Sequence, residues 1–257
     1  MISYCIACFR PAYARLLIED LVSKTTAKFE ILVWLNLENE AFEKFLFERV
    51  QKNYPLKIIG KTPANPGMQV YSELFRRSQY ELIVQIDDDV VMVSRRIAEC
   101  AMELFTRFKE VKQLVADVWQ DEYTTGARPP MSAYRVFNEK HGLYEGPIDG
   151  WLSIYHRSIL PLIAPIPRSQ YLPIGGLTHQ QLQRHGLKGL LCRRFKVFHV
   201  IGPQYASFFD MLDFEIHKYK MLGRQEIVQW YEKERVNLPE RHILEKNVEK
   251  IRQELNQ

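Results

Sequence analysis

The sequence has no long hydrophobic run. None of its apolar segments approaches the ~18 residues with which a helix crosses a bilayer, so we expect no integral membrane segment. The first residues, Met1–Cys5, carry neither a basic region nor a signal-cleavage pattern, which argues against secretion. These absences predict a soluble, cytoplasmic protein that is at most peripheral at a membrane.

Cysteine is also scarce. The chain contains only four cysteines, Cys5, Cys8, Cys100 and Cys192, and their spacings form no disulfide framework. Cys5 and Cys8 have a C-x-x-C spacing, but they lie in a predicted strand and no second pair follows nearby. We therefore expect a reducing compartment and neither a zinc site nor a redox motif.

Acidic residues are missing from one long window. The net charge of the chain is +4, yet no Asp or Glu occurs between Gly150 and Phe209. Seven basic residues lie there: Arg157, Arg168, Arg184, Lys188, Arg193, Arg194 and Lys196. The rest of the chain then carries 28 − 31 = −3. Such a window should attract an anionic ligand, unless the skew is a chance property of a mainly buried segment.

The first 120 residues contain a regular alternation of strand and helix patterns. Strands are predicted at 2–8, 29–35, 56–59, 82–86 and 113–118, and helices from Pro11, at 41–50, at 71–78 and after a capping Ser94. This alternation is typical of an α/β protein with a parallel sheet flanked by helices. Later segments are less regular, with strand-like stretches at 148–155 and 190–200, a helix at 178–185 and helical patterns from 209.

The most informative segment is the apolar strand 82–86, which ends in Asp87, Asp88 and Asp89. Three adjacent carboxylates repel one another, and a divalent cation such as Mg²⁺ or Mn²⁺ relieves that repulsion through oxygen ligands. Ligands of parallel α/β sheets bind beyond the carboxyl ends of the strands. The segment therefore predicts a metal site, with a solvated acidic turn as the alternative.

Two flanking motifs resemble the GT-A glycosyltransferases, particularly family-2-like enzymes that use nucleotide-sugar donors. The segment Ala7–Pro11 resembles the turn after their first strand. Asn65–Gly67, followed by a helix and then by Tyr80–Asp89, resembles their approach to the D-x-D motif. The resemblance covers residues 2–92 in order and spacing.

This resemblance implies the GT-A (nucleotide-diphospho-sugar transferase) fold, a central, mostly parallel twisted sheet flanked by helices. The implied domain occupies residues 1–205, divided into a nucleotide-sugar-binding half, 1–120, and an acceptor-side half, 121–205. A C-terminal helical extension would follow over 206–257.

The resemblance also implies a donor site for a UDP- or GDP-sugar. Asp89 would bind Mn²⁺ or Mg²⁺ at the diphosphate, and Asp87 would face the ribose or a metal-bound water. His199 resembles the late histidine that completes the metal coordination. The residues implied for nucleotide-sugar binding are Phe9, Arg10, Asn36, Asp87 and Asp88.

The catalytic base is where the sequence departs from the family. Inverting members carry an acidic pair where this chain has Ile174–Leu182, a stretch without a carboxylate. An inverting reaction needs a base for the acceptor hydroxyl, and Asp149 and His179 are the candidates. A retaining reaction needs no such base, and Asp149 is then a turn residue.

The acceptor site is predicted around Gly150 and Trp151, with Arg193 and Arg194 from the acid-free window. Glycine permits close approach of a ligand, and an indole can stack on a sugar, although a core position for Trp151 is equally compatible with the pattern. The predicted acceptor is anionic: a glycan, a lipid-linked phosphosugar or a nucleic acid.

The sequence thus favours a metal-dependent glycosyltransferase, a hexosyl- or related transferase. A phage-type DNA-base glycosyltransferase is a variant, although no basic run is interleaved with aromatic residues. A non-catalytic sugar-nucleotide-binding module is the alternative from another class, favoured by the missing acidic pair. A nucleotidyltransferase is disfavoured because Cys8–Pro11 contains no glycine.

Overall fold

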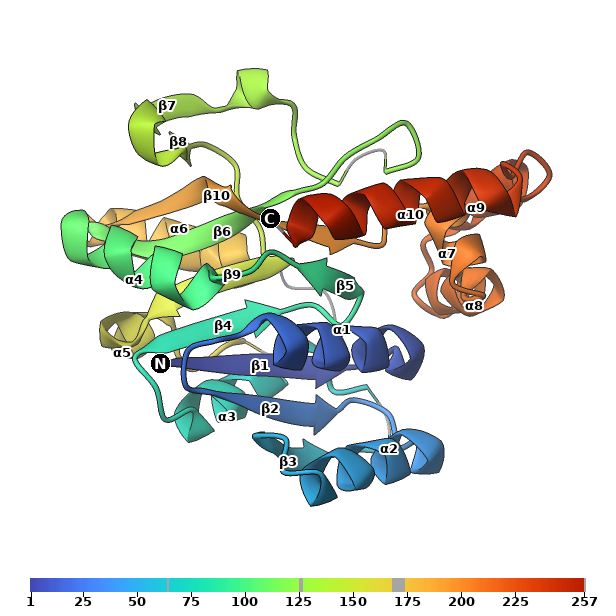
Figure 1. Cartoon of the computed structure of the whole chain (residues 1–257), viewed down its shortest axis with the longest axis horizontal. Helices are drawn as coiled ribbons and strands as arrows, with labels where there is room; N and C mark the ends of the chain where they lie inside the picture. Colours follow the sequence, from blue (N-terminus) through green and yellow to red (C-terminus); the bar gives the residue numbers. More distant parts are fainter. Residues whose placement is uncertain (64, 125–126, 168–173, 257) are drawn as a thin grey trace.

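A computed structural model of the chain describes residues 1–63, 65–124, 127–167 and 174–256, and Arg168 of the acid-free window lies outside them. Within the described residues, ten strands form one sheet between helices (Figure 1). The strand order is β3-β2-β1-β4-β9-β6-β10-β8-β7, and β5 pairs with β10 beside this path. The predicted α/β class is confirmed.

The elements follow the predicted alternation closely in the first half of the chain. The strands are β1 (Ile2–Cys8), β2 (Phe29–Leu35), β3 (Leu56–Lys61), β4 (Leu82–Ile86), β5 (Val90–Val93), β6 (Val111–Val118), β7 (Arg135–Asn138), β8 (Leu143–Glu145), β9 (Leu152–His156) and β10 (Lys188–His199). The α-helices are α1 (Pro11–Lys24), α2 (Glu40–Gln51), α3 (Val70–Arg77), α4 (Ile97–Arg107), α5 (Leu160–Ile163), α6 (Ile174–Arg184), α7 (Pro203–Phe208), α8 (Leu212–Met221), α9 (Gln225–Arg235) and α10 (Arg241–Leu255).

The long strands of the sheet point in the same direction. Strand β1 is parallel to β2 and β4, β2 is parallel to β3, and β6 is parallel to β10. Strand β9 lies antiparallel between β4 and β6, so both flanking groups share one orientation. The carboxyl ends of β1, β2, β4, β6 and β10 therefore meet at one edge of the sheet.

Helices cover both faces of the sheet because their apolar residues recur at helical spacing. On α1 these are Ala14, Leu17, Ile18 and Leu21, which join the core cluster that also contains residues of α2 and α4. Helices α3 and α6 contribute to a second cluster on the other face. The alternation of side chains along β1 sends Cys8 into the first cluster and Cys5 into the second.

Strand β5 and the position of Ser94 differ from the sequence prediction. Val90–Val93 pairs antiparallel with the end of β10, a pairing that a four-residue apolar segment did not reveal. Ser94 does not cap α4, whose N-cap is Arg96. The Ser94 hydroxyl instead donates to the carbonyl of Lys196, 3.0 Å away. Both differences arise because β10 reaches back to the segment that follows the aspartates.

The chain is helical after β10. Helix α10 packs against α7, β10 and β5, and Leu244, Val248 and Ile251 share a cluster with Tyr13 of α1 and Phe198 of β10. Helix α8 buries two charged residues, Glu215 and Lys218. Across the described ranges, none of the helices combines the length and the hydrophobicity needed to span a bilayer.

Candidate active site

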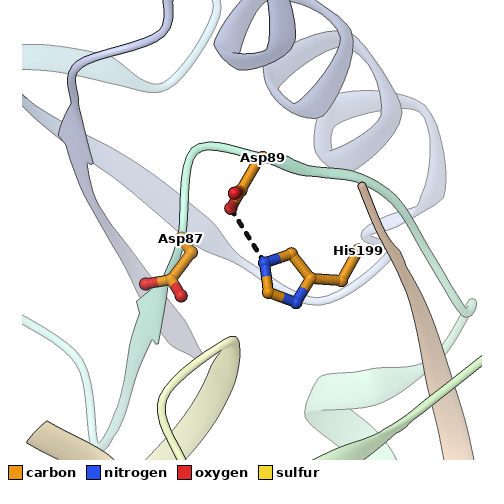
Figure 2. Close-up of side chains that lie close together, drawn as sticks. All are labelled: Asp87, Asp89 and His199. Atoms are coloured by element: carbon orange, nitrogen blue, oxygen red, sulfur yellow. Dashed lines mark hydrogen bonds and ion pairs between the residues drawn. The ribbon is translucent and has the colours of Figure 1, made fainter. Parts of the chain in front are cut away.

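Asp87, Asp89 and His199 converge at the carboxyl edge of the sheet (Figure 2). One potential ligand atom from each residue lies within 4.8 Å of the other two. His199 Nε2 is 3.0 Å from Asp89 Oδ1. The backbone fixes the turn, because Asp87 N–H donates to the carbonyl of Trp151, 3.0 Å away, and Val90 N–H to that of Asp87, 3.1 Å away.

Strand β10 brings His199 to the aspartates from a distant part of the sequence. The antiparallel β5–β10 pairing places His199 opposite Val90, directly after the three acids. Val200 N–H then donates to the carbonyl of Asp89 across 2.9 Å. The imidazole therefore meets the aspartates through regular backbone pairing.

The electrostatics of this cluster favour a bound cation. Burial, reinforced by the charge of Asp89, raises the pKa of Asp87 to about 7. Although burial opposes it, the charges of Arg10 and His199 hold the pKa of Asp89 below its usual range. Burial acts against protonation of His199, but Asp89 raises the pKa of its imidazole overall. Two carboxylates and an imidazole suit Mn²⁺ or Mg²⁺, so the residues fit the predicted metal.

Asp88 ties the end of β1 to the acidic turn. Its Oδ2 accepts the N–H groups of Phe9, at 2.6 Å, and of Arg10, while the Arg10 guanidinium contacts its other oxygen. Arg10 also lies 2.9 Å from Asp89 Oδ2. The acidic turn and the β1 loop therefore form one rigid unit, and the direct partners of Asp88 are protein groups.

Helix α8 extends this charged network from the C-terminal part of the chain. Glu215 Oε1 lies 2.8 Å from Arg10 Nε, and Lys218 pairs with the same glutamate. The ring of Phe214 lies against that of Phe9, with centroids 5.6 Å apart. Sequence reasoning missed Glu215 and Lys218, because an i, i+3 charge pair on a helix reads as a solvated face.

Replacement of Arg10 should destabilise the protein, because Asp88, Asp89 and Glu215 would lose their common positive partner. Arg10→Ala leaves three buried carboxylates without their shared guanidinium, and we expect a loss of about 3–5 kcal/mol in the free energy of unfolding. Mn²⁺ should restore more of the melting temperature in Arg10→Ala than it adds to the unaltered protein. Thermal unfolding with and without Mn²⁺ measures both quantities.

Arg235→Ala is the matched control, because Arg235 forms an exposed ion pair with Asp213. Such pairs contribute about 0–1 kcal/mol, so this variant should melt almost normally. If Arg10→Ala unfolds at the same temperature as the control, the network does not stabilise the site. If Arg10→Ala does not fold at all, Arg10→Lys tests the same contacts with the charge retained.

The residues predicted for the nucleoside, Phe9, Arg10 and Asn36, lie at adjacent strand ends. Asn36 is buried, and its N–H donates to the carbonyl of Cys8 across 2.8 Å. Its Oδ1 has no hydrogen-bond partner among the described residues. An unpaired buried acceptor beside the β1 loop is available to a donor group of a ligand.

Asp149 lies beside the cluster, whereas His179 does not. Loss of hydration raises the pKa of Asp149, while the Gly150 N–H and the charge of His199 act in the opposite direction. The side chain nevertheless reaches solvent. His179 Nδ1 instead lies against Gly189 near the start of β10, ten residues before the end of that strand at His199.

Gly150 and Trp151 serve the packing of the sheet. A Cβ on Gly150 would lie 2.3 Å from Gln85 Nε2, so a larger residue would force the Gln85 side chain to shift. Trp151 is buried in the core, and its indole N–H donates to the carbonyl of Ala116 across 2.7 Å. Trp151 therefore occupies a core position in this structure. A stacking role would require the ring to leave these contacts.

The positive charges of the acid-free window do not form one patch. Lys188 pairs with Glu145 at 2.6 Å, and Arg194 pairs with Glu103 of α4 at 2.9 Å. Arg157 donates to the carbonyls of Ser78 and Tyr80. Acids from other segments thus neutralise Lys188 and Arg194, whereas Arg157 is held by neutral backbone carbonyls. Arg193 has a different environment, in which it faces Asp117 at 3.5 Å.

A surface depression without the acidic cluster lies at the opposite edge of the sheet. It has a volume of about 720 Å³ and is lined by residues of α4 together with Met1 and Ala27. These residues lie near the amino ends of β1 and β2. The chemistry is concentrated at the carboxyl edge, so size alone does not locate the functional site.

Comparison with solved structures places this arrangement in a known fold. GalNAc-T7, crystallised with UDP, GalNAc and Mn²⁺, matches with a TM-score of 0.63 and 12% identity over 79% of this chain and 43% of that chain. S. aureus TarS in complex with UDP-GlcNAc matches with a TM-score of 0.58 and 11% identity over 82% and 63% of the two chains. The mannosyltransferase PcManGT from Pyrobaculum calidifontis, with GDP-Man and Mn²⁺, matches with a TM-score of 0.59 and 11% identity over 87% and 64%.

The chain therefore has the GT-A fold of nucleotide-sugar glycosyltransferases, as the sequence motifs predicted. It spans about two fifths of the length of GalNAc-T7 and less than two thirds of the TarS and PcManGT chains. Comparison with protein-family models and with curated proteins gave no match. At 11–12% identity the structural likeness defines the fold.

Proposed function

We propose that the protein is a metal-dependent glycosyltransferase that transfers a sugar from a UDP- or GDP-sugar to an acceptor. The observation that supports this most strongly is the meeting of Asp87, Asp89 and His199 at the carboxyl edge of a GT-A sheet. The solved structures of this fold with UDP or GDP-Man and Mn²⁺ support the same class of donor.

In this proposal Asp87, Asp89 and His199 hold Mn²⁺ or Mg²⁺. When bound, the ion supplies electrophilic stabilisation of the departing nucleoside diphosphate. The protein contributes a prearranged set of ligands, because the Asp88 contacts fix the turn and β5–β10 pairing fixes the histidine. Phe9, Arg10 and Asn36 would contact the nucleotide, and Asp88 would act through the β1 loop.

For an inverting reaction we propose Asp149 as the base that removes the proton of the acceptor hydroxyl. Its carboxylate reaches solvent beside the metal-binding residues, where an acceptor has to approach. His179 is the weaker candidate because it packs at the far end of β10. The acceptor would then lie over the Asp149–Gly150 turn, and an anionic acceptor remains part of the proposal.

A panel of donors tests this function. We expect hydrolysis of, or transfer from, a UDP- or GDP-sugar in the presence of Mn²⁺, and loss of that activity when EDTA removes the ion. Restoration by added Mn²⁺ controls for damage by the chelator. Equal activity with and without EDTA would contradict metal dependence.

A non-catalytic sugar-nucleotide-binding module is the second candidate. It is favoured by the absence of any carboxylate from 174–182, the described segment at which inverting relatives in the resemblance carry their acidic pair. The same panel separates the two proposals. The binding module is supported if a donor binds in a metal-dependent way but is not turned over with any acceptor, with or without phosphate. Turnover supports the enzyme.

A further inference from the structure

A polar cavity lies between the end of β6, strand β10 and the last turns of α10. Its volume is about 270 Å³. Four basic side chains line it: Arg128 from the loop after β6, Arg193 and Lys196 from β10, and Lys250 from α10. Its acidic residues are Asp117 and Glu254, so the cavity carries a net charge of 4 − 2 = +2.

Asp117 holds two of the cations in place. Its buried carboxylate contacts Arg128 Nε at 2.5 Å and Arg193 Nε at 3.5 Å. Both arginines thus use Nε on Asp117, and Arg193 also stacks over the ring of Tyr144, with its guanidinium carbon 5.9 Å from the centroid. Both contacts leave the terminal amino groups of Arg193 without a partner among the described residues.

The other two cations, Lys196 and Lys250, are not engaged within the part of the chain that the structure describes. Among the described residues, neither Lys196 nor Lys250 makes a side-chain hydrogen bond or an ion pair. The remaining acid is engaged, because Glu254 Oε2 accepts the indole N–H of Trp119 across 2.9 Å. The unbalanced positive charge of the cavity therefore belongs mainly to Arg193, Lys196 and Lys250.

We propose that this cavity binds a phosphate dianion, free or as a terminal monoester on a larger ligand. A phosphate monoester carries about −1.5 to −2 charges near pH 7, which matches the net charge of the cavity. Arginine recognises phosphate through paired N–H groups, and lysine adds a mobile point charge. The volume admits a phosphate group with room for part of its carrier.

The site is separate from the metal-binding cluster and does not rest on the proposed transfer reaction. Lys196 lies three residues before His199 on β10, and its neighbours in the cavity come from β6 and from α10. A phosphate held here would thus sit beside the acceptor half of the sheet. It would recognise either a phosphorylated acceptor or a small phosphorylated effector.

Binding of inorganic phosphate and of glucose 6-phosphate tests the proposal, with glucose as the uncharged probe. Calorimetry on the whole chain in EDTA, without nucleotide and at fixed ionic strength, keeps the metal cluster out of the measurement. Arg193→Gln and Lys196→Gln should each weaken binding by about tenfold, the effect of one charge-assisted contact. Arg194→Gln is the matched control, because Arg194 is the next residue after Arg193 but its side chain pairs with Glu103 instead of lining the cavity.

A site for esterified phosphate is supported if Arg193→Gln and Lys196→Gln both weaken the binding of phosphate and of glucose 6-phosphate, while Arg194→Gln weakens neither. The same pattern for inorganic phosphate alone supports a free-phosphate site. Equal weakening in Arg194→Gln, or no binding to the unaltered protein, overturns the proposal. Donor turnover, measured separately, is expected to be independent of this result, so the two hypotheses can fail separately.

Discussion

Asp89→Ala should abolish manganese-dependent donor binding. Asp89 contributes a buried carboxylate that contacts both His199 and Arg10, and no neighbouring acid can take its place without moving the turn. Loss of a group that only orients a metal ligand costs about 10–100-fold in affinity, so loss of a direct ligand should exceed about 100-fold. Calorimetric titration of Mn²⁺ in the presence and absence of a UDP- or GDP-sugar measures the change. His199→Ala should weaken binding less.

Asp213→Asn is the control for this experiment, because Asp213 is exposed on α8 and pairs only with a surface arginine in the described structure. It should bind Mn²⁺ normally. Circular dichroism and thermal unfolding without metal show whether Asp89→Ala retains the fold. Full manganese-dependent turnover by a folded Asp89→Ala variant would contradict the assignment of the metal to this site.

Asp149→Asn should reduce turnover by about 10²–10⁴-fold if the reaction inverts, the usual contribution of a general base. The substitution preserves the shape of the side chain and leaves the fold intact, so donor binding should change little. A base acts in its deprotonated form, and the pKa of Asp149 is raised by loss of hydration. The activity of the unaltered enzyme should therefore fall as the pH drops through a value above the ordinary range of aspartate. A pH–rate profile at saturating metal measures this limb.

His179→Gln is the matched variant for the base. His179 Nε2 contacts Gln183, and its other ring nitrogen packs against Gly189, so glutamine can replace it without touching Asp149. Near-normal turnover of His179→Gln with a loss in Asp149→Asn assigns the base. Near-normal turnover of both, with a product that keeps the configuration of the donor, means a retaining reaction.

The fold and the acidic turn were predictable because their signals are local. Each early strand is a short apolar run between helical patterns, and Asp87–Asp89 follow one such run directly. Their position at the carboxyl edge then follows from the parallel topology. His199 needed the family resemblance, since a histidine near the end of a strand has no distinctive pattern of its own.

The charged surroundings were not predictable, because their partners are distant in sequence. The acid-free window contains Lys188 and Arg194, yet Glu145 and Glu103 neutralise them from other segments. Counting charges along the chain cannot detect this pairing. Glu215 on α8 was missed for the same reason, since only the fold brings it to Arg10.

The pairing of β5 with β10 also has a consequence for the order in which the protein is built. Asp89 and His199 are separated by 110 residues, and their meeting requires β10 to pair with both β5 and β6. Contacts of such high sequence separation form at the cost of closing a long loop. A nascent chain that has only its first half therefore holds the two acids without the histidine, and the proposed three-residue metal site can form only once β10 has been synthesised.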